Sequence, residues 1–177
     1  MPEPIDTLLE TKRFAVVQRH AIRRDGTPAT CEYVHHPGSV AILPLVDERH
    51  VCLIRSRRLT VDETLIEIPA GTREAGESPL DTARRELAEE TGYRATRFDE
   101  LTRIFPSPGV IDEQMWLYVA REMTAGDPAR EPNEEIDNLI VDFEDALGMI
   151  DRDEVRDGKT IVALLLYDRR RRSSPFA

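Results

Sequence analysis

Five charged residues stand at fixed spacings between two glycines in the segment 71–92, and their types suit the binding of a metal ion. They are Glu77, Arg85, Glu86, Glu89 and Glu90. A helix would place Glu86, Glu89 and Glu90 on one face, because residues three and four apart are neighbours there. Like charges at this spacing repel each other, so the pattern indicates a bound cation. Hard divalent metals such as Mg2+ prefer oxygen ligands, which makes this face a candidate metal site.

Helix signals surround the charged residues. Ser78 is a suitable N-cap, Pro79 fits the first helical position, and Gly92 fits the residue just past the end. At about 100° per residue, four further side chains cluster on one inward-facing side: Leu80, Ala83, Leu87 and Thr91. The sequence therefore predicts a helix over 79–91 that buries one side and presents carboxylates on another. The loop 71–77 leads the chain into this helix.

The segment resembles the Nudix box, G-x5-E-x7-R-E-U-x-E-E-x-G-U, in which U is a bulky apolar residue. Its fixed positions are matched by Gly71, Glu77, Arg85, Glu86, Leu87, Glu89, Glu90 and Gly92. Tyr93 is aromatic where an aliphatic residue is usual, a departure that leaves the chemistry unchanged. A solvated acidic helix is the alternative for an ordinary charge run. That alternative does not explain why both glycines and the arginine also fall in place.

Three stretches outside the box are similar to the ADP-ribose pyrophosphatase branch of this family. Glu67-Ile-Pro-Ala-Gly71 resembles its E-L-P-A-G sequence. Pro106-Ser-Pro-Gly109, followed by Asp112-Glu113, resembles its P-S-P-G-x-x-D-E loop. Asp157-Gly-Lys-Thr-Ile161 resembles its D-x-K-T segment. Other sugar-nucleotide hydrolases, including GDP-mannose types, share these elements, so the pattern does not separate the substrates.

The resemblance implies a role for each residue of the acidic face. Glu86 and Glu90 would be the principal ligands of Mg2+, with Glu89 close by and the Ala70 carbonyl completing the shell. Mn2+ would be able to substitute for Mg2+. Arg85 and Glu77 would orient the carboxylates rather than touch the substrate, because an arginine can hold a carboxylate by paired hydrogen bonds.

The resemblance places the catalytic base in an acidic loop after the box, here residues 131–136. Glu134 is the first candidate for the base or for a third metal ligand, Glu135 the second and Glu131 the third. A solvated acidic loop is the alternative for each of them. One alignment of this loop puts Pro132 where a base would sit, which would weaken the assignment.

Substrate contacts are implied at positions before and after the box. Arg58 matches the arginine of a Q-Y-R element of the branch, although Ser56 replaces its glutamine. The alternative for Arg58 is a charge that guards an edge strand against aggregation. The remaining candidates are Glu67, Pro108, Gly109 and, for stacking on an adenine, Phe14. Prolines stiffen a loop wherever they occur, which is the alternative for the residues near Pro108.

The reaction that the resemblance implies is hydrolysis of a nucleoside diphosphate linked to another moiety. For ADP-ribose, water would attack a phosphorus of the pyrophosphate and release AMP and ribose 5-phosphate. A GDP-mannose or other nucleotide-sugar pyrophosphatase is the alternative enzyme. A nucleotide-sensing Nudix module without turnover is the alternative from another class, although a pure binder need not keep all four box glutamates.

Composition excludes several other classes of function. The chain has 177 residues, 40% hydrophobic and 33% charged, which suits one globular domain with a core. A net charge of −10 argues against nucleic-acid binding. The longest apolar run, 161–167, is too short to span a membrane, and the N-terminus lacks the pattern of a signal peptide. Cys31 and Cys52 show no metal spacing, so we expect free buried thiols and a cytoplasmic protein.

Strands dominate the early part of the chain, and helices follow in the middle and at the end, which indicates an α+β fold. Predicted strands cover 13–23, 31–35, 39–46, 50–55, 64–68, 97–103, 114–120 and 135–141, and predicted helices cover 79–91, 143–150 and 159–169. The Nudix resemblance implies an α/β/α sandwich with a mixed sheet over 38–168. Residues 1–37 would form a small N-terminal β segment, which in this branch commonly exchanges strands in a homodimer. Residues 169–177 are expected to be a flexible basic tail.

Overall fold

The computed structural model describes residues 5–11, 14–130 and 135–173, which form ten strands and three helices. The strands are β1 (Ile5–Glu10), β2 (Ala15–Ile22), β3 (Pro28–His35), β4 (Ser39–Pro44), β5 (His50–Arg58), β6 (Glu63–Glu67), β7 (Ala70–Thr72), β8 (Arg94–Ile104), β9 (Met115–Thr124) and β10 (Ile136–Asp142). The helices are α1 (Pro79–Thr91), α2 (Phe143–Asp151) and α3 (Gly158–Ser173). Every predicted strand and helix overlaps one of these elements, whereas β1 and β7 were not predicted.

The strand β4 is the centre of the fold. All six of its residues are buried, as expected for a continuous apolar run that is covered on both faces. It pairs with β7 in the antiparallel sense and with β9 in the parallel sense, in a sheet of order β7-β4-β9-β8. A second, antiparallel sheet has the order β10-β5-β6. The larger sheet is therefore mixed, as the Nudix resemblance implied.

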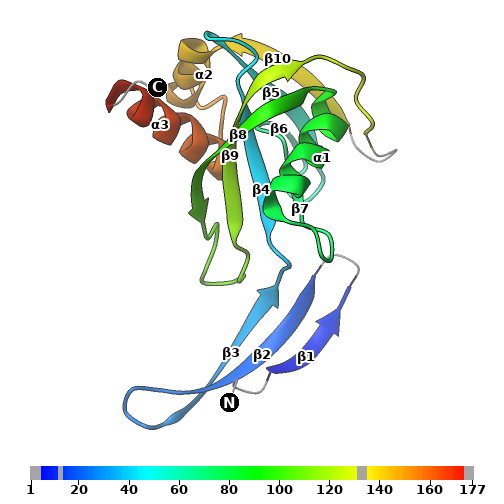
Figure 1. Cartoon of the computed structure of the whole chain (residues 1–177). Coiled ribbons are helices and arrows are strands. Elements are labelled where there is room, and N and C mark those ends of the chain that lie inside the picture. Colours follow the sequence, from blue (N-terminus) through cyan, green and yellow to red (C-terminus); the bar gives the residue numbers. More distant parts are fainter. Residues whose placement is uncertain (1–4, 12–13, 131–134, 174–177) are drawn as a thin grey trace.

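The side chains of β4 alternate between two hydrophobic cores. Val40 and Ile42 pack with Leu87 of α1 on one face. Ala41 and Leu43 belong to the larger core on the other face, which also takes in buried side chains of α2 and α3. Figure 1 shows α1 on one side of β4 and β9 and the pair α2 and α3 on the other. The expected α/β/α layering is confirmed, and it leaves α1 on one face of the mixed sheet.

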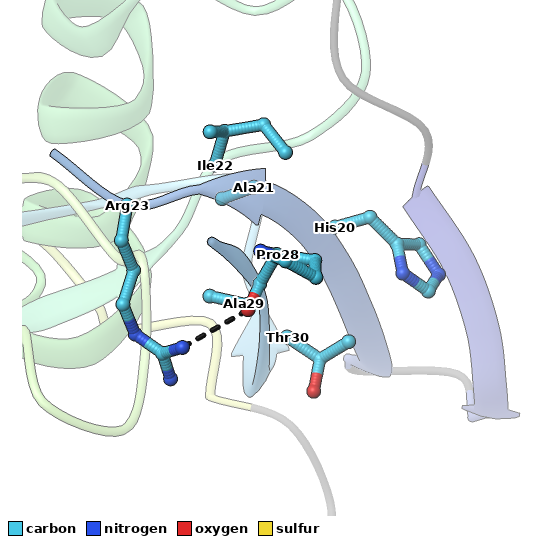
Figure 2. Close-up of a pocket in the computed structure, with 7 residues that line it drawn as sticks. All are labelled: His20, Ala21, Ile22, Arg23, Pro28, Ala29 and Thr30. Carbon is cyan, nitrogen blue, oxygen red and sulfur yellow. Dashed lines mark hydrogen bonds between the residues drawn. The ribbon is translucent and has the colours of Figure 1, made fainter. Parts of the chain in front are cut away.

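An N-terminal sheet of order β1-β2-β3 extends away from these layers (Figure 1). Its β2–β3 hairpin closes at an Asp25-Gly26 turn, where Gly26 has a φ of +85°. All of β1 is exposed, including Ile5, Leu8 and Leu9. Because this strand has no buried face, its sequence lacks the alternation of apolar and polar residues that would have predicted it. A hollow of about 640 Å3 lies along the hairpin and is lined by residues of β2, β3 and the turn between them (Figure 2).

The C-terminal helix continues beyond the boundary that the sequence suggested. Residues 169–173 are helical, so this part of the expected 169–177 tail belongs to α3 instead. Asp168 accepts hydrogen bonds from both Arg171 and Arg172, and the Arg171 guanidinium lies 4.5 Å from the Phe143 ring centroid. Cations near the end of a helix also interact favourably with its dipole. These contacts explain why the basic run remains helical.

Both cysteines are free thiols, as expected, but only Cys52 is buried and Cys31 is exposed. Burial raises the pKa of the Cys52 thiol to about 12, so that side chain stays protonated. No helix among the described residues has the length and apolar character that crossing a bilayer requires.

Candidate active site

The helix α1 begins and ends where the sequence predicted. The Ser78 side chain accepts a hydrogen bond from the Asp81 amide at 3.2 Å, and Pro79 occupies the first helical position. Gly92 ends the helix with a φ of +80°, and its amide donates to the Ala88 carbonyl. Leu87 is fully buried on the side that faces the sheet. Packing and capping together therefore fix how α1 presents its acidic residues.

Arg85 joins three of the four acidic residues, which we call the carboxylate cluster (Glu77, Glu86, Glu89 and Glu90). Its Nε and Nη2 donate to the two oxygens of Glu77 at 3.1 and 3.0 Å. Its Nη1 donates to Glu86 at 2.7 Å and to Glu89 at 3.0 Å. The hydrogen bonds from Arg85 lower the pKa of the Glu77 carboxyl to about 2 and raise the pKa of the guanidinium itself. Arg85 thus has the contacts expected of a residue that orients carboxylates.

The short strand β7 meets α1 at two of the acidic positions, Glu86 and Glu90. The Ala70 amide donates to Glu90 Oε2 at 3.0 Å, which ties the end of α1 to the strand. At Gly71, an added Cβ would overlap the carboxylate of Glu86. Glu86 and Glu90 are largely buried, with 9% and 4% of their surface exposed. Because Gly71, the first glycine of the motif, has no side chain, the Glu86 carboxylate can occupy the space beside it.

Arg58 and Glu67 form one bidentate pair. Arg58 donates from Nε and Nη2 to the two oxygens of Glu67 at 2.7 and 2.8 Å. Glu67 is also paired with Lys159, and its side chain is 1% exposed, whereas 40% of the Arg58 side chain is exposed. Burial alone would raise the pKa of Glu67, but the hydrogen bonds and charges of Arg58 and Lys159 outweigh it and hold that pKa below its ordinary value.

The proline-rich loop that contains Pro108 and Gly109 contacts β3. The Val34 amide donates to the Val110 carbonyl at 2.8 Å, and the Asp112 amide donates to the Val34 carbonyl at 3.1 Å. Asp112 also lies 2.7 Å from the His35 ring nitrogen. His35 ends the predicted strand 31–35, and no residue near it in the sequence indicated its contact with Asp112. The N-terminal sheet therefore helps to hold the loop in which two candidate substrate contacts lie.

Two other candidate residues lie next to β2 and β10, and two lie beyond the described residues. Phe14 precedes β2 and is 40% exposed. Glu135 is exposed just before β10, and its carbonyl accepts a hydrogen bond from the Arg57 amide at 3.1 Å. Glu131 and Glu134 lie outside the described residues. Of the three candidate bases, Glu135 alone therefore lies among the described residues.

Comparison with known proteins identifies the family. Residues 35–164 match the family model described as the NUDIX domain. This chain belongs to the Nudix family. An ADP-ribose pyrophosphatase of Bacillus subtilis is 39% identical over 142 residues, with 79% of this chain and 77% of that protein covered. A methanol dehydrogenase activator of Bacillus methanolicus is 34% identical with the same coverage. A GDP-mannose pyrophosphatase of an Enterobacter species is 32% identical, with 72% and 71% covered.

A solved structure shares the fold of this Nudix hydrolase. It is the crystal structure of an ADP compounds hydrolase, which matches with a TM-score of 0.82 over 96% of this chain and 92% of its own. Its sequence identity is 20%, so the likeness concerns the fold. The mixed sheet and three helices described above are therefore those of a Nudix hydrolase.

The carboxylate cluster fits a divalent metal ion in its chemistry. Carboxylate oxygens are the ligands that hard cations prefer, and the space at Gly71 admits the Glu86 carboxylate beside the Ala70 backbone. Within the residues that the structure describes, no three acidic, histidine or cysteine side chains are grouped closely enough to hold an ion. Arg85 contacts Glu86 and Glu89 in this arrangement. A Nudix metal ion would therefore share these two carboxylates with Arg85.

The charge balance around Arg85 leads to a prediction about pH. A carboxylate whose pKa is lower in the folded state stabilises the fold above its unfolded pKa, and loses this contribution as the pH falls. The Glu77 pKa of about 2 places the loss between about pH 4.5 and pH 2. We expect Arg85→Met to unfold at a lower temperature than the wild type at pH 7. The thermal midpoint should fall by about 2–4 °C for each kcal/mol of unfolding free energy that is lost. The gap, by which we mean the difference in thermal midpoint between the variant and the wild type, should shrink towards pH 2.

Circular dichroism melting curves at several pH values measure this gap. The matched control is Arg84→Met, because Arg84 neighbours Arg85 but its ion pair with Asp81, at 3.3 Å, is exposed. The Arg84 guanidinium otherwise lies 5.9 Å from the Phe98 ring centroid. The control should show a small gap that hardly changes with pH. A gap for Arg85→Met that stays constant from pH 7 to pH 2 would remove Arg85 as the source of the Glu77 shift.

Proposed function

We propose that this Nudix hydrolase cleaves the pyrophosphate of ADP-ribose and releases AMP and ribose 5-phosphate, with Mg2+ as its metal and Mn2+ as a substitute. One observation carries the proposal: the box residues form a connected arrangement in which Arg85 holds Glu77, Glu86 and Glu89, and the Glu86 carboxylate lies against Gly71. A relative that is 39% identical bears the name ADP-ribose pyrophosphatase, which supports the choice of substrate.

The metal would be held by Glu86, Glu90 and the Ala70 carbonyl, with Glu89 beside them. When bound, the ion supplies positive charge that offsets the anionic pyrophosphate. Arg85 keeps the carboxylates oriented, and Glu77 in turn fixes Arg85 through its bidentate pair. A glutamate of the loop 131–136 would accept the proton of the attacking water, with Glu134 as the first candidate and Glu135 as the second.

Substrate contacts would come from outside the box. Because Glu67 holds the Arg58 guanidinium by two hydrogen bonds while part of the side chain stays exposed, Arg58 is pre-oriented for a phosphate or ribose oxygen. Glu67 itself would act mainly through Arg58, since its side chain is 1% exposed. Pro108 and Gly109 would border the substrate from the loop that β3 holds. Phe14 would stack on the base.

The decisive experiment measures the release of AMP from ADP-ribose with and without Mg2+, and the hydrolysis of GDP-mannose alongside. Relatives named GDP-mannose pyrophosphatase, 30–32% identical, make that the second candidate substrate. We expect Mg2+-dependent release of AMP and slower cleavage of GDP-mannose. Faster cleavage of GDP-mannose would replace the proposed substrate. Binding of ADP-ribose without turnover would indicate a sensing module instead.

We also propose that the chain is a homodimer formed through its N-terminal sheet. Ile5, Leu8 and Leu9 of β1 are each at least 50% exposed, and a small three-stranded sheet is seldom stable without a packed face. The same sheet also has the hollow along β2 and β3 (Figure 2). The free thiols fit a reducing compartment, so we place the protein in the cytoplasm.

Light scattering after gel filtration tests the dimer. We expect twice the chain mass for the wild type and a shift towards the monomer for Leu9→Glu, because the new charge would be buried at the interface. Leu59→Glu is the matched control, since Leu59 is 83% exposed in the turn between β5 and β6. A wild-type protein with the mass of one chain would refute the proposed dimer.

A further inference from the structure

A buried network of charges joins the beginning of α3 to the end of β6. Lys159 is paired with Glu67 and, at 3.0 Å, with Asp157. Only 11% of the Lys159 side chain and 1% of the Glu67 side chain are exposed. Charges removed from water in this way are tolerated when they are paired and hydrogen-bonded. Arg58 supplies the second cation next to Glu67, so the network contains two positive and two negative groups.

Thr160 extends the network to the backbone of the segment that follows β6. Its hydroxyl accepts a hydrogen bond from the Ile68 amide at 2.8 Å and donates to Asp157. Thr160 and Ile68 are both fully buried. Asp157 also accepts from the Thr160 amide at 3.0 Å, which caps the start of α3. One residue of α3 thereby satisfies a buried backbone donor that β6 leaves unpaired at its end.

Four consecutive positions, 67–70, are each held by a partner distant in sequence. Lys159 contacts the Glu67 side chain and Thr160 contacts the Ile68 amide, so α3 supplies two of the four partners. The Pro69 carbonyl accepts from the Ile42 amide of β4 at 2.9 Å. The Ala70 amide donates to Glu90 of α1 at 3.0 Å. The segment is therefore fixed from α3 at one end and from α1 at the other.

We propose that Lys159 and Thr160 are positioning residues for the metal site, because they fix the backbone that carries the Ala70 carbonyl. This inference rests on the metal site of the proposed function. Pro69 has a restricted φ, so displacement at Glu67 or Ile68 would be passed to Ala70 rather than absorbed between them. A buried ion pair without such a role would change the stability of the fold and leave the affinity for metal unchanged.

The test is the affinity of the substrate-free protein for Mn2+, measured by electron paramagnetic resonance as the loss of the free-ion signal. We expect Lys159→Met to weaken the binding of Mn2+ by about tenfold, the lower range for changes to groups that support metal ligands. Arg156→Met is the matched control. Arg156 also pairs with a glutamate of β6, Glu63, but both side chains are about half exposed. The control should bind Mn2+ as the wild type does.

Thr160→Val provides a second variant of nearly unchanged shape, which removes the acceptor of the Ile68 amide without changing any charge. We expect Thr160→Val to bind Mn2+ more weakly than the wild type does. This variant tests the positioning role even if Lys159→Met does not fold. Wild-type affinity for Mn2+ in folded Thr160→Val would overturn the inference, even if its thermal midpoint falls. A wild-type protein that takes up no Mn2+ would overturn both the metal site and the inference. Uptake of Mn2+ without hydrolysis of ADP-ribose would overturn the proposed function alone.

Discussion

Replacement of Glu90 by glutamine should lower the turnover of ADP-ribose by about 1,000-fold and leave the thermal midpoint near or above that of the wild type. Such a loss corresponds to about 4 kcal/mol, within the range that a bound metal contributes to a transition state. Glu90 is 4% exposed and shares its helix face with Glu86, so removing its charge relieves repulsion. The amide oxygen of the glutamine keeps an acceptor for the Ala70 amide.

This combination of effects separates a role in catalysis from a role in stability. Turnover at saturating Mg2+ and a thermal melting curve are measured on the same preparation. Glu74→Gln is the control, because Glu74 is an exposed glutamate of the same motif at a position that the Nudix box leaves variable. It should retain wild-type turnover. Full activity of Glu90→Gln would remove Glu90 from the mechanism.

The parts of the site that the sequence predicted are those with short-range causes. Ser78, Pro79 and Gly92 define the ends of α1 through caps that involve residues no more than four positions away. The spacing of Glu86, Glu89 and Glu90 is likewise local, since a helical turn alone places them together. The central strand β4 was recognisable because both of its faces are buried and its residues are accordingly apolar.

The parts that the sequence did not predict depend on contacts between distant segments. Lys159 pairs with Glu67 across 92 positions, and no periodic pattern links the two. In isolation, Lys159 reads as an ordinary residue of a helix start, and Glu67 reads as a substrate contact. His35 and Asp112 are 77 positions apart and present the same difficulty. Such pairs follow from the order of the strands, which a spacing rule does not specify.

The N-terminal sheet was only partly predictable for a different physical reason. The strands β2 and β3 are joined by a tight turn with a recognisable Asp-Gly signal. The strand β1 has no buried side, so its polar and apolar residues do not alternate in the way that a half-buried strand requires. The exposed side chains Ile5, Leu8 and Leu9, which made β1 hard to predict, are also the observation from which we propose the dimer.

Substitution of Gly71 by alanine should abolish most of the activity through the displacement of a single carboxylate. An added Cβ would overlap Glu86, whose oxygen is held by Arg85 at 2.7 Å and whose surroundings leave it 9% exposed. Glu86 must therefore leave its place beside the Ala70 backbone. We expect kcat/KM for ADP-ribose to fall by at least about 100-fold, or about 2.7 kcal/mol. The affinity for Mn2+ should fall in parallel.

Gly76→Ala in the same loop distinguishes this clash from a general intolerance of substitution. Gly76 has a φ of +82° and no heavy atom within 4 Å of an added Cβ. The substitution should therefore lower the free energy of unfolding through backbone strain alone, by about 1 kcal/mol. It should lower the thermal midpoint slightly and leave the binding of Mn2+ unchanged. Gly71 has no positive φ, so its substitution acts through the Glu86 carboxylate. Wild-type kcat/KM in Gly71→Ala would show that Glu86 need not occupy this space for catalysis.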